Sequence, residues 1–215
     1  PVGKGTRRAC SSVSWNRNNH NHVAAGFELL KGDFCVLLWD IHQQREKDKE
    51  AAKDRQPLVK LCYEEATSSL CWLPDNPHML TVGTSMGWVR IFDTRVGDKG
   101  SAEASLMAHP AARPRKVKGV MPDPFNSHIL ATYSDTAGES IKLWDIRKDT
   151  SSKSKLTALF TISPGEPEGQ QGAQVTVTDF QWSLDRANVC VVATNRHKQI
   201  LFFNTSKSAA DVVTR

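Results

Sequence analysis

No stretch of the 215-residue sequence approaches the roughly 18 consecutive apolar residues that a helix needs to cross a bilayer. The longest apolar clusters, such as residues 35–39, have the length of a strand. The sequence also lacks a C-x-x-C pair, which argues against a zinc ribbon. The cysteines are odd in number and scattered, so a small disulfide framework does not fit, and a reducing, cytoplasmic setting is the simplest interpretation; they are Cys10, Cys35, Cys62, Cys71 and Cys190.

Motifs of catalytic chemistry are missing as well. There is no G-x-S-x-G element to mark an activated serine. Residues 3–6 (GKGT) lack the upstream glycine and strand of a phosphate-binding loop. His20 and His22 have no third ligand near them in the sequence, so a turn is favoured over a metal site. We therefore expect no enzyme activity, no cofactor, no metal site and no small-molecule substrate.

The overall composition is that of an ordinary globular protein, with 39% hydrophobic and 24% charged residues. The formal net charge of +5 permits an acidic partner or a membrane surface but demands neither. Because the sequence begins with Pro1 and not with Met, we expect it to be cut from a longer protein.

A repeated pattern runs along the whole sequence. Each unit contains a run that reads apolar, variable, apolar, aromatic, Asp or Asn, and then a β-former or turn residue. The acidic or amide positions are 40, 93, 145 and 204, which lie 53, 52 and 59 residues apart. Two further strand-like runs precede each of these, separated by turn residues. Outer fourth strands are predicted at residues 58–63, 104–107 and 156–162.

Four strands per unit, repeated in one order, predict an all-β fold: a β-propeller fragment of about four four-stranded blades from a larger ring. The expected blades cover approximately residues 7–65, 66–110, 115–163 and 175–206, with loop insertions at 43–55 and 163–174. In each unit an aromatic residue fills the space between blades and an Asp or Asn suits the turn that follows; these structural repeat positions are Trp39, Asp40, Phe92, Asp93, Trp144, Asp145, Phe203 and Asn204.

These units resemble the WD-repeat family. Trp39-Asp40 and Trp144-Asp145 match the dipeptide that gives the family its name, and the phenylalanine-containing pairs of the other two units are common variants. The Gly-His dipeptide of many WD repeats is absent from all four units. The hydrogen-bond network that some members build around that histidine is therefore not expected here.

A closer resemblance is to the propeller of the Mio (Missing oocyte) proteins. It is carried by residues 8–16, 33–41, 70–74, 117–124 and 141–148, in the same order. The combination of Leu-Cys-Trp-Leu-Pro with Val-x-Pro-Asp-Pro is the most specific part. The resemblance implies a non-catalytic scaffold subunit of the GATOR nutrient-sensing assembly, which regulates target-of-rapamycin signalling in response to amino acids. It also implies WD-repeat and solenoid protein partners and a cytoplasmic location, with peripheral association at the lysosomal or vacuolar surface through the complex and no membrane insertion.

A basic stretch is the best candidate for a partner contact. Arg113, Arg115, Lys116 and Lys118 place four cations in six residues, and Trp88 begins a predicted strand where it can be more exposed than the other aromatics. Such a stretch can simply be a solvated loop. If it has a function, we expect it to contact an acidic protein partner. No aromatic residues interleave the cations for base stacking, so nucleic acid is disfavoured. The alternative function is a chromatin- or nucleic-acid-associated WD-repeat reader.

Overall fold

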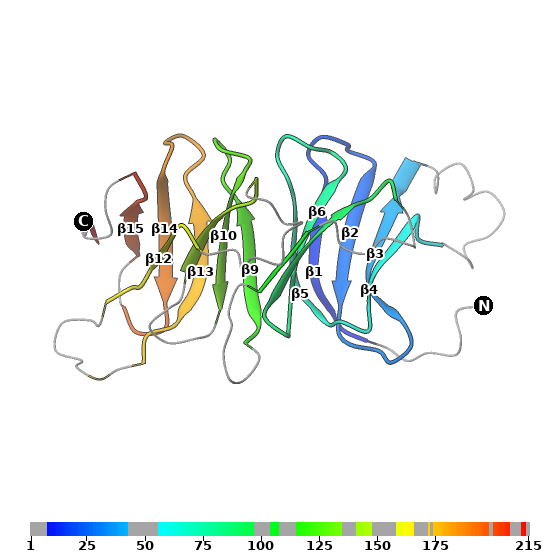
Figure 1. Ribbon diagram of the computed structural model, residues 1–215, viewed down its shortest axis with the longest axis horizontal. Helices are drawn as coiled ribbons and strands as arrows, with labels where there is room; N and C mark the ends of the chain where they lie inside the picture. Colours follow the sequence, from blue (N-terminus) through cyan, green and yellow to red (C-terminus); the bar gives the residue numbers. More distant parts are fainter. Residues whose placement is uncertain are drawn as a thin grey trace.

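The computed structural model describes residues 8–42, 56–96, 104–107, 115–134, 141–147, 158–165, 172, 174–197, 200–206 and 212–213. In these residues sixteen strands form four sheets, and each sheet is a meander of four antiparallel strands. Figure 1 shows the four sheets standing side by side in one row, with the first and fourth at opposite ends. This arrangement confirms the all-β propeller fragment that the repeat predicts.

Each sheet takes its strands from one continuous part of the chain. The first sheet contains β1 (Cys10–Trp15), β2 (His22–Phe27), β3 (Phe34–Asp40) and β4 (Val59–Tyr63). The second contains β5 (Thr67–Trp72), β6 (Met79–Thr84), β7 (Trp88–Asp93) and β8 (Ala104–Met107). The third contains β9 (Val117–Pro122), β10 (Ile129–Ser134), β11 (Ile141–Asp145) and β12 (Phe160–Ile162). The fourth contains β13 (Val177–Trp182), β14 (Val189–Thr194), β15 (Leu201–Asn204) and β16 (Val212–Val213), and so extends past the expected end at residue 206.

Some expected features lie outside the described residues. They are the insertion at 43–55, most of the loop at 163–174, and Arg113.

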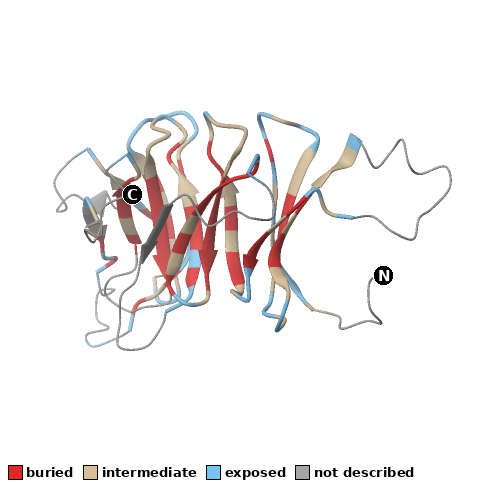
Figure 2. Ribbon diagram, turned by 45° about the vertical axis from the view of Figure 1, so that its right-hand side comes forward, coloured by how far each residue is buried: buried red, intermediate tan, exposed pale blue. Residues whose placement is uncertain are grey.

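The core consists of the three interfaces between neighbouring sheets. Leu38 and Val36 of the first sheet pack with Leu80 and Trp72 of the second. The second and third sheets meet around Val89, Val117 and Trp144, and the third and fourth around Ile141, Phe180 and Val192. In Figure 2 the buried residues accordingly concentrate on the strands and the exposed ones on the turns. A strand covered on both faces has to be apolar on both, which explains the dense Val, Leu, Ile and Cys of the inner strands.

Serine hydroxyls tie neighbouring blades together at equivalent points. In every sheet the pairing of the first two strands has one register shift, which leaves residues 11, 68, 118 and 178 unpaired. The hydroxyl of Ser11 donates to the carbonyl of Thr67 at 2.7 Å, and that of Ser68 to the carbonyl of Val117 at 2.5 Å. Both acceptors belong to the next sheet along the chain. The third sheet has Lys118 at this position, and that side chain is exposed.

Glycine sets how closely the blades approach. A Cβ on Gly26 would lie 2.4 Å from Thr67, and one on Gly83 would lie 2.8 Å from Val117, so each glycine admits the neighbouring blade. The third sheet reverses the arrangement, because Tyr133 pairs with Gly119 of the adjacent strand of its own sheet. A Cβ on Gly119 would lie only 1.9 Å from the Tyr133 ring, so the ring lies across the glycine.

The outer face of the first sheet shows how a neighbouring blade changes the burial of equivalent residues. Trp15 and Trp72 end the first strands of the first two sheets and are equivalent in the repeat. Trp72 is only 6% exposed because the first sheet covers it, whereas Trp15 is 56% exposed. Val13, on the same strand, is also exposed. Among the described residues, therefore, no sheet covers this apolar face.

Candidate interaction surfaces

The four repeated Asp or Asn residues make the same turn. Each side-chain oxygen accepts the backbone N–H of the residue two positions later, over 2.9 Å for Asp40, 2.9 Å for Asp93, 3.0 Å for Asp145 and 3.0 Å for Asn204. This contact closes an Asx turn at the end of each third strand. A carboxylate or amide oxygen is therefore used for the same structural purpose in every blade.

Two of these turns also hold an arginine side chain. The guanidinium of Arg147 donates to Asp145 from Nε at 3.1 Å and from Nη2 at 2.8 Å. Arg95 donates to Asp93 in the same two-pronged way, from Nε at 2.9 Å and from Nη2. The hydrogen bonds from Arg95 and Arg147 lower the pKa of Asp93 and of Asp145 to about 2, so both carboxylates are ionised at neutral pH.

The repeated aromatic residues differ in burial according to their place in the row. Phe92 and Trp144 are buried, while Trp39 and Phe203 are half-buried. The indole N–H of Trp144 donates to the hydroxyl of Thr132 at 2.9 Å, which satisfies a polar group inside the third sheet. Trp39 lies on the outer face of the first sheet, where its ring meets Phe27 edge-on at 6.4 Å.

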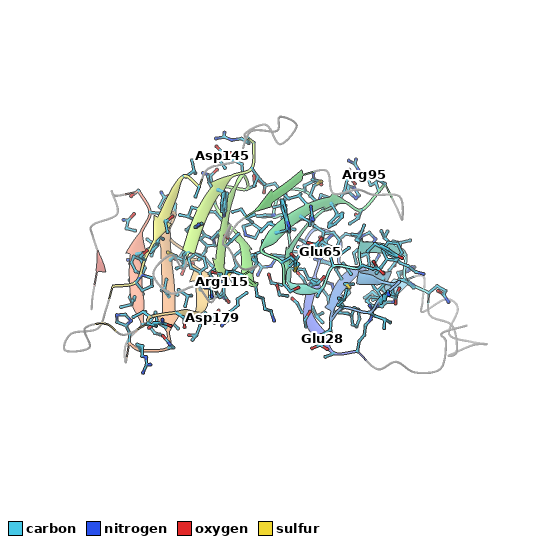
Figure 3. The ribbon with its side chains drawn as sticks, turned by 60° about the horizontal axis from the view of Figure 1, so that its bottom comes forward. Glu28, Glu65, Arg95, Arg115, Asp145 and Asp179 are labelled. Atoms are coloured by element: carbon cyan, nitrogen blue, oxygen red, sulfur yellow. The ribbon has the colours of Figure 1, made fainter. Side chains whose placement is uncertain are left out.

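The basic stretch lies at the entry to the third sheet. Arg115 and Lys116 precede β9 and are exposed, and Lys118 is the exposed bulge residue within it. Figure 3 places Arg115 on the same side of the molecule as the carboxylates of Glu28 and Asp179, away from Arg95 and Asp145. This side therefore carries charges of both signs.

Trp88 is held by its neighbours. It is half-buried at the start of β7, and the guanidinium of Arg90 lies 4.8 Å from the centre of its ring. Arg90 also donates from Nε to Glu65 at 3.0 Å. Trp88, expected to be more exposed than the other aromatics, is thus one part of a Trp–Arg–Glu group in which the guanidinium lies over the face of its ring.

The described residues contain neither a metal-binding cluster nor a membrane-spanning helix. In the part of the chain that the structure describes, no group of three or more His, Cys, Asp or Glu residues is arranged to hold a metal ion. Within the same residues no helix is long and apolar enough to cross a membrane.

The repeat pattern predicts the aspartates as turn residues but does not single out Arg95 and Arg147. The tripeptide Asp-x-Arg, which could have indicated them, occurs in the second and third units, whereas the first has Asp-x-His and the fourth Asn-x-Ser. The spacing is informative because an Asx turn brings the side chain of the residue two positions later back over the carboxylate.

Four stacked antiparallel meanders, each closing its third strand with the same Asp or Asn turn after an aromatic residue, define a WD-repeat β-propeller fragment. Comparison with known proteins narrows this class. The family model described as "MIOS, WD40 repeat" matches residues 2–165, so the chain belongs to the MIOS WD40-repeat family. The resemblance to the Mio proteins seen in the sequence is thereby confirmed.

Curated relatives agree with this assignment. The GATOR2 complex protein MIOS of Dictyostelium discoideum is 30% identical over 181 residues, covering 65% of this chain and 15% of the relative. MIOS-A of Xenopus laevis is 30% identical over 156 residues, covering 66% of this chain and 16% of its own length. The GATOR2 complex protein Mio of Drosophila melanogaster is 28% identical over 142 residues, covering 66% of this chain and 14% of the relative. The matched part therefore spans only 14–16% of the length of these relatives.

A solved structure supports the fold alone. A chain of the COPII outer coat vertex on membranes superimposes with a TM-score of 0.67 at 19% identity, covering 93% of this chain and 47% of that one. The stacked-blade arrangement is therefore shared with a protein of clearly different sequence.

Proposed function

We propose that this chain is part of a non-catalytic scaffold propeller in a subunit of a GATOR2-type complex. The observation that carries the proposal is the family match over residues 2–165, together with relatives that are themselves named as GATOR2 proteins. Within that complex the expected partners are other WD-repeat and solenoid subunits. The role extends to regulation of target-of-rapamycin signalling by amino acids, in the cytoplasm and at the lysosomal or vacuolar surface through the complex.

The chemistry of the blades supports a structural role. The repeated carboxylates accept backbone N–H groups in turns, and the buried hydroxyls of Ser68 and Thr132 accept or donate bonds within and between blades. Burial raises the pKa of the Cys62 and Cys71 thiols, which opposes formation of the reactive thiolate. These polar groups are used to hold the fold, as expected of a protein that acts by binding.

We further propose that Arg115, Lys116 and Lys118 contact an acidic surface of a neighbouring subunit, and that Arg113 and Trp88 add to this contact. The three described cations are exposed and lie within four residues of one another. Arg115 lies on the same side of the molecule as the carboxylates of Glu28 and Asp179. This favours a partner with a defined pattern of charges over a polyanion, because a mixed-charge side attracts a uniform polyanion weakly.

Affinity capture of the full-length endogenous protein, with quantitative mass spectrometry of the co-purifying proteins, tests this function. The expected result is recovery of other WD-repeat and solenoid subunits in near-equal amounts. Recovery of histones, or of nucleic acid that survives moderate salt, would support the reader alternative and remove the scaffold assignment.

A charge-reversal variant then tests the basic stretch. R115E/K116E/K118E should lower the recovery of one subunit, while K60E, which reverses a charge in the first sheet, serves as the control. Unchanged recovery in both variants would show that the basic stretch is a solvated loop.

A further inference from the structure

The two Asp–Arg pairs lie on the same side of the propeller fragment. Asp93 and Asp145 end the third strands of adjacent sheets, β7 and β11, which run in equivalent directions. Figure 3 shows Arg95 and Asp145 along one side of the molecule, opposite Arg115, Asp179 and Glu28. We call the surface formed by Arg95, Val96, Phe125, Arg147 and Leu184 the Asp–Arg edge.

The two arginines of this edge are held in place and are also exposed to solvent. The guanidinium of Arg95 is held by three hydrogen bonds to its carboxylate and that of Arg147 by two, and each turn is itself fixed by a backbone N–H. The side chains of Arg95 and Arg147 nevertheless remain 64% and 65% exposed. An arginine that is already oriented loses little conformational freedom when it binds, so it offers a pre-organised donor fork.

Apolar side chains lie on the same edge. In the second and third sheets the turn between the first two strands ends beside the Asp–Arg turn, since the N–H of Ile146 donates to the carbonyl of His128 at 2.9 Å and that of Thr94 to the carbonyl of His78 at 2.9 Å. Phe125 on the turn of the third sheet is 51% exposed, although its N–H is bound by the buried carboxylate of Asp123 at 2.8 Å.

Two more apolar residues extend the edge on either side. Val96 follows Arg95 directly and is 57% exposed, and Leu184 on the corresponding turn of the fourth sheet is 68% exposed. The edge therefore combines aliphatic and aromatic contacts with fixed arginines, the composition enriched at protein interfaces.

The charge pattern selects the kind of partner. Because Asp93 and Asp145 largely neutralise the two arginines, the edge does not present the strong positive field that attracts nucleic acid. A guanidinium bound through Nε and Nη2 can still engage a second planar carboxylate through its remaining edge, as the geometry of Arg147 allows. The exposed apolar residues require a ligand with apolar side chains between its acidic groups.

We propose that the Asp–Arg edge binds an acidic segment of a partner protein in which Asp or Glu alternates with Leu or Phe. Carboxylates of the segment pair with Arg95 and Arg147, and its apolar side chains cover Phe125, Val96 and Leu184. This inference rests on the proposed function only in taking the protein to be a protein-binding module. It assigns a second contact surface, on the side opposite the basic stretch around Arg115.

The test uses the full-length protein in its purified complex and measures binding of fluorescein-labelled peptides by anisotropy. The probe peptide combines Glu with Leu and Phe, and its matched control carries Gln in place of each Glu. The protein variants are R95Q/R147Q and, as a control that removes the same charge from exposed loops at the other ends of the sheets, K31Q/R196Q. Recovery of the complex is checked first for each variant, since it reports on the proposed function separately.

The expected result is that R95Q/R147Q weakens binding of the Glu peptide about 10-fold or more, that K31Q/R196Q changes it by less than about 3-fold, and that the Gln peptide binds poorly. F125S should weaken binding of the same peptide, which general charge attraction would not predict. Equal loss in both double variants, equal binding of the Gln peptide, or no binding of any peptide by an intact complex would overturn the inference. Stronger competition by a DNA oligonucleotide than by the peptide would overturn it in favour of a phosphate ligand.

Discussion

The pairing of Gly119 with Tyr133 allows a sharp test of how the third blade is packed. An alanine at position 119 would place its Cβ 1.9 Å from Cε1 of Tyr133 and 2.6 Å from both Cδ1 and Cζ. Carbon atoms in proteins pack at about 3.5–4.0 Å, so the ring has to move by roughly 1.5 Å. Tyr133 is buried and packs in the cluster that joins the third and fourth sheets, so the movement disturbs that interface.

The expected cost follows from two opposing effects. Overpacking in a close-packed interior destabilises by about 1–3 kcal/mol. Replacing glycine stabilises by about 0.4–1 kcal/mol, because the unfolded chain loses conformational freedom. The net expectation for G119A is a loss of about 1–2 kcal/mol, which raises the opening equilibrium of the third sheet about 5- to 30-fold.

Hydrogen–deuterium exchange of the full-length protein measures this locally, in peptides that cover β9 and β10. G119A should speed exchange there, whereas G165A should not, because a Cβ on Gly165 has no atom within 4 Å. In a Y133A background the alanine at 119 should cost nothing further, so the double-mutant cycle should show a coupling of about 1–3 kcal/mol. Equal effects of G119A with and without the tyrosine ring would refute the proposed packing.

Three further outcomes are expected. W144F removes the indole donor to a buried hydroxyl and should destabilise by about 1–3 kcal/mol in chemical denaturation, whereas an effect no larger than that of a surface substitution would contradict the buried bond. In alkylation followed by mass spectrometry, the exposed Cys10 should react well before Cys190, because burial raises the pKa of Cys190 to about 12. The difference in rate should vanish in denaturant, and equal rates in the native protein would contradict the burial of Cys190. The hydrogen bond from Arg147 depresses the Asp145 pKa to about 2. The stabilisation of the folded state by this ion pair is therefore fully present above about pH 4 and is lost as the pH falls towards 2. The destabilisation caused by R147Q should therefore shrink across that window in thermal unfolding, and a pH-independent difference would exclude the ionic mechanism.

Much of the architecture could be predicted because it is encoded locally and four times over. Period-2 patterning and turn residues mark the first three strands of each unit, and the aromatic–Asp step marks the end of the third. The outer strands are less regular: β12 begins at Phe160, whereas the pattern predicts a start near residue 156. An outer strand pairs on one side only, so its sequence is constrained less than that of an inner strand.

The sequence by itself therefore determined the all-β class, the four units, the turn at each Asp or Asn, and the resemblance to the Mio family. The tertiary structure alone decided which equivalent residues differ in environment. Trp15 and Trp72 occupy the same repeat position, yet only Trp72 is covered by a neighbouring sheet. It also decided that Arg95 and Asp145, which are far apart in the chain, lie along one edge, while Arg115 lies on the other side. Strand propensity and turn chemistry act over a few residues and are written in the local sequence, whereas burial and shared surfaces depend on how whole sheets stack.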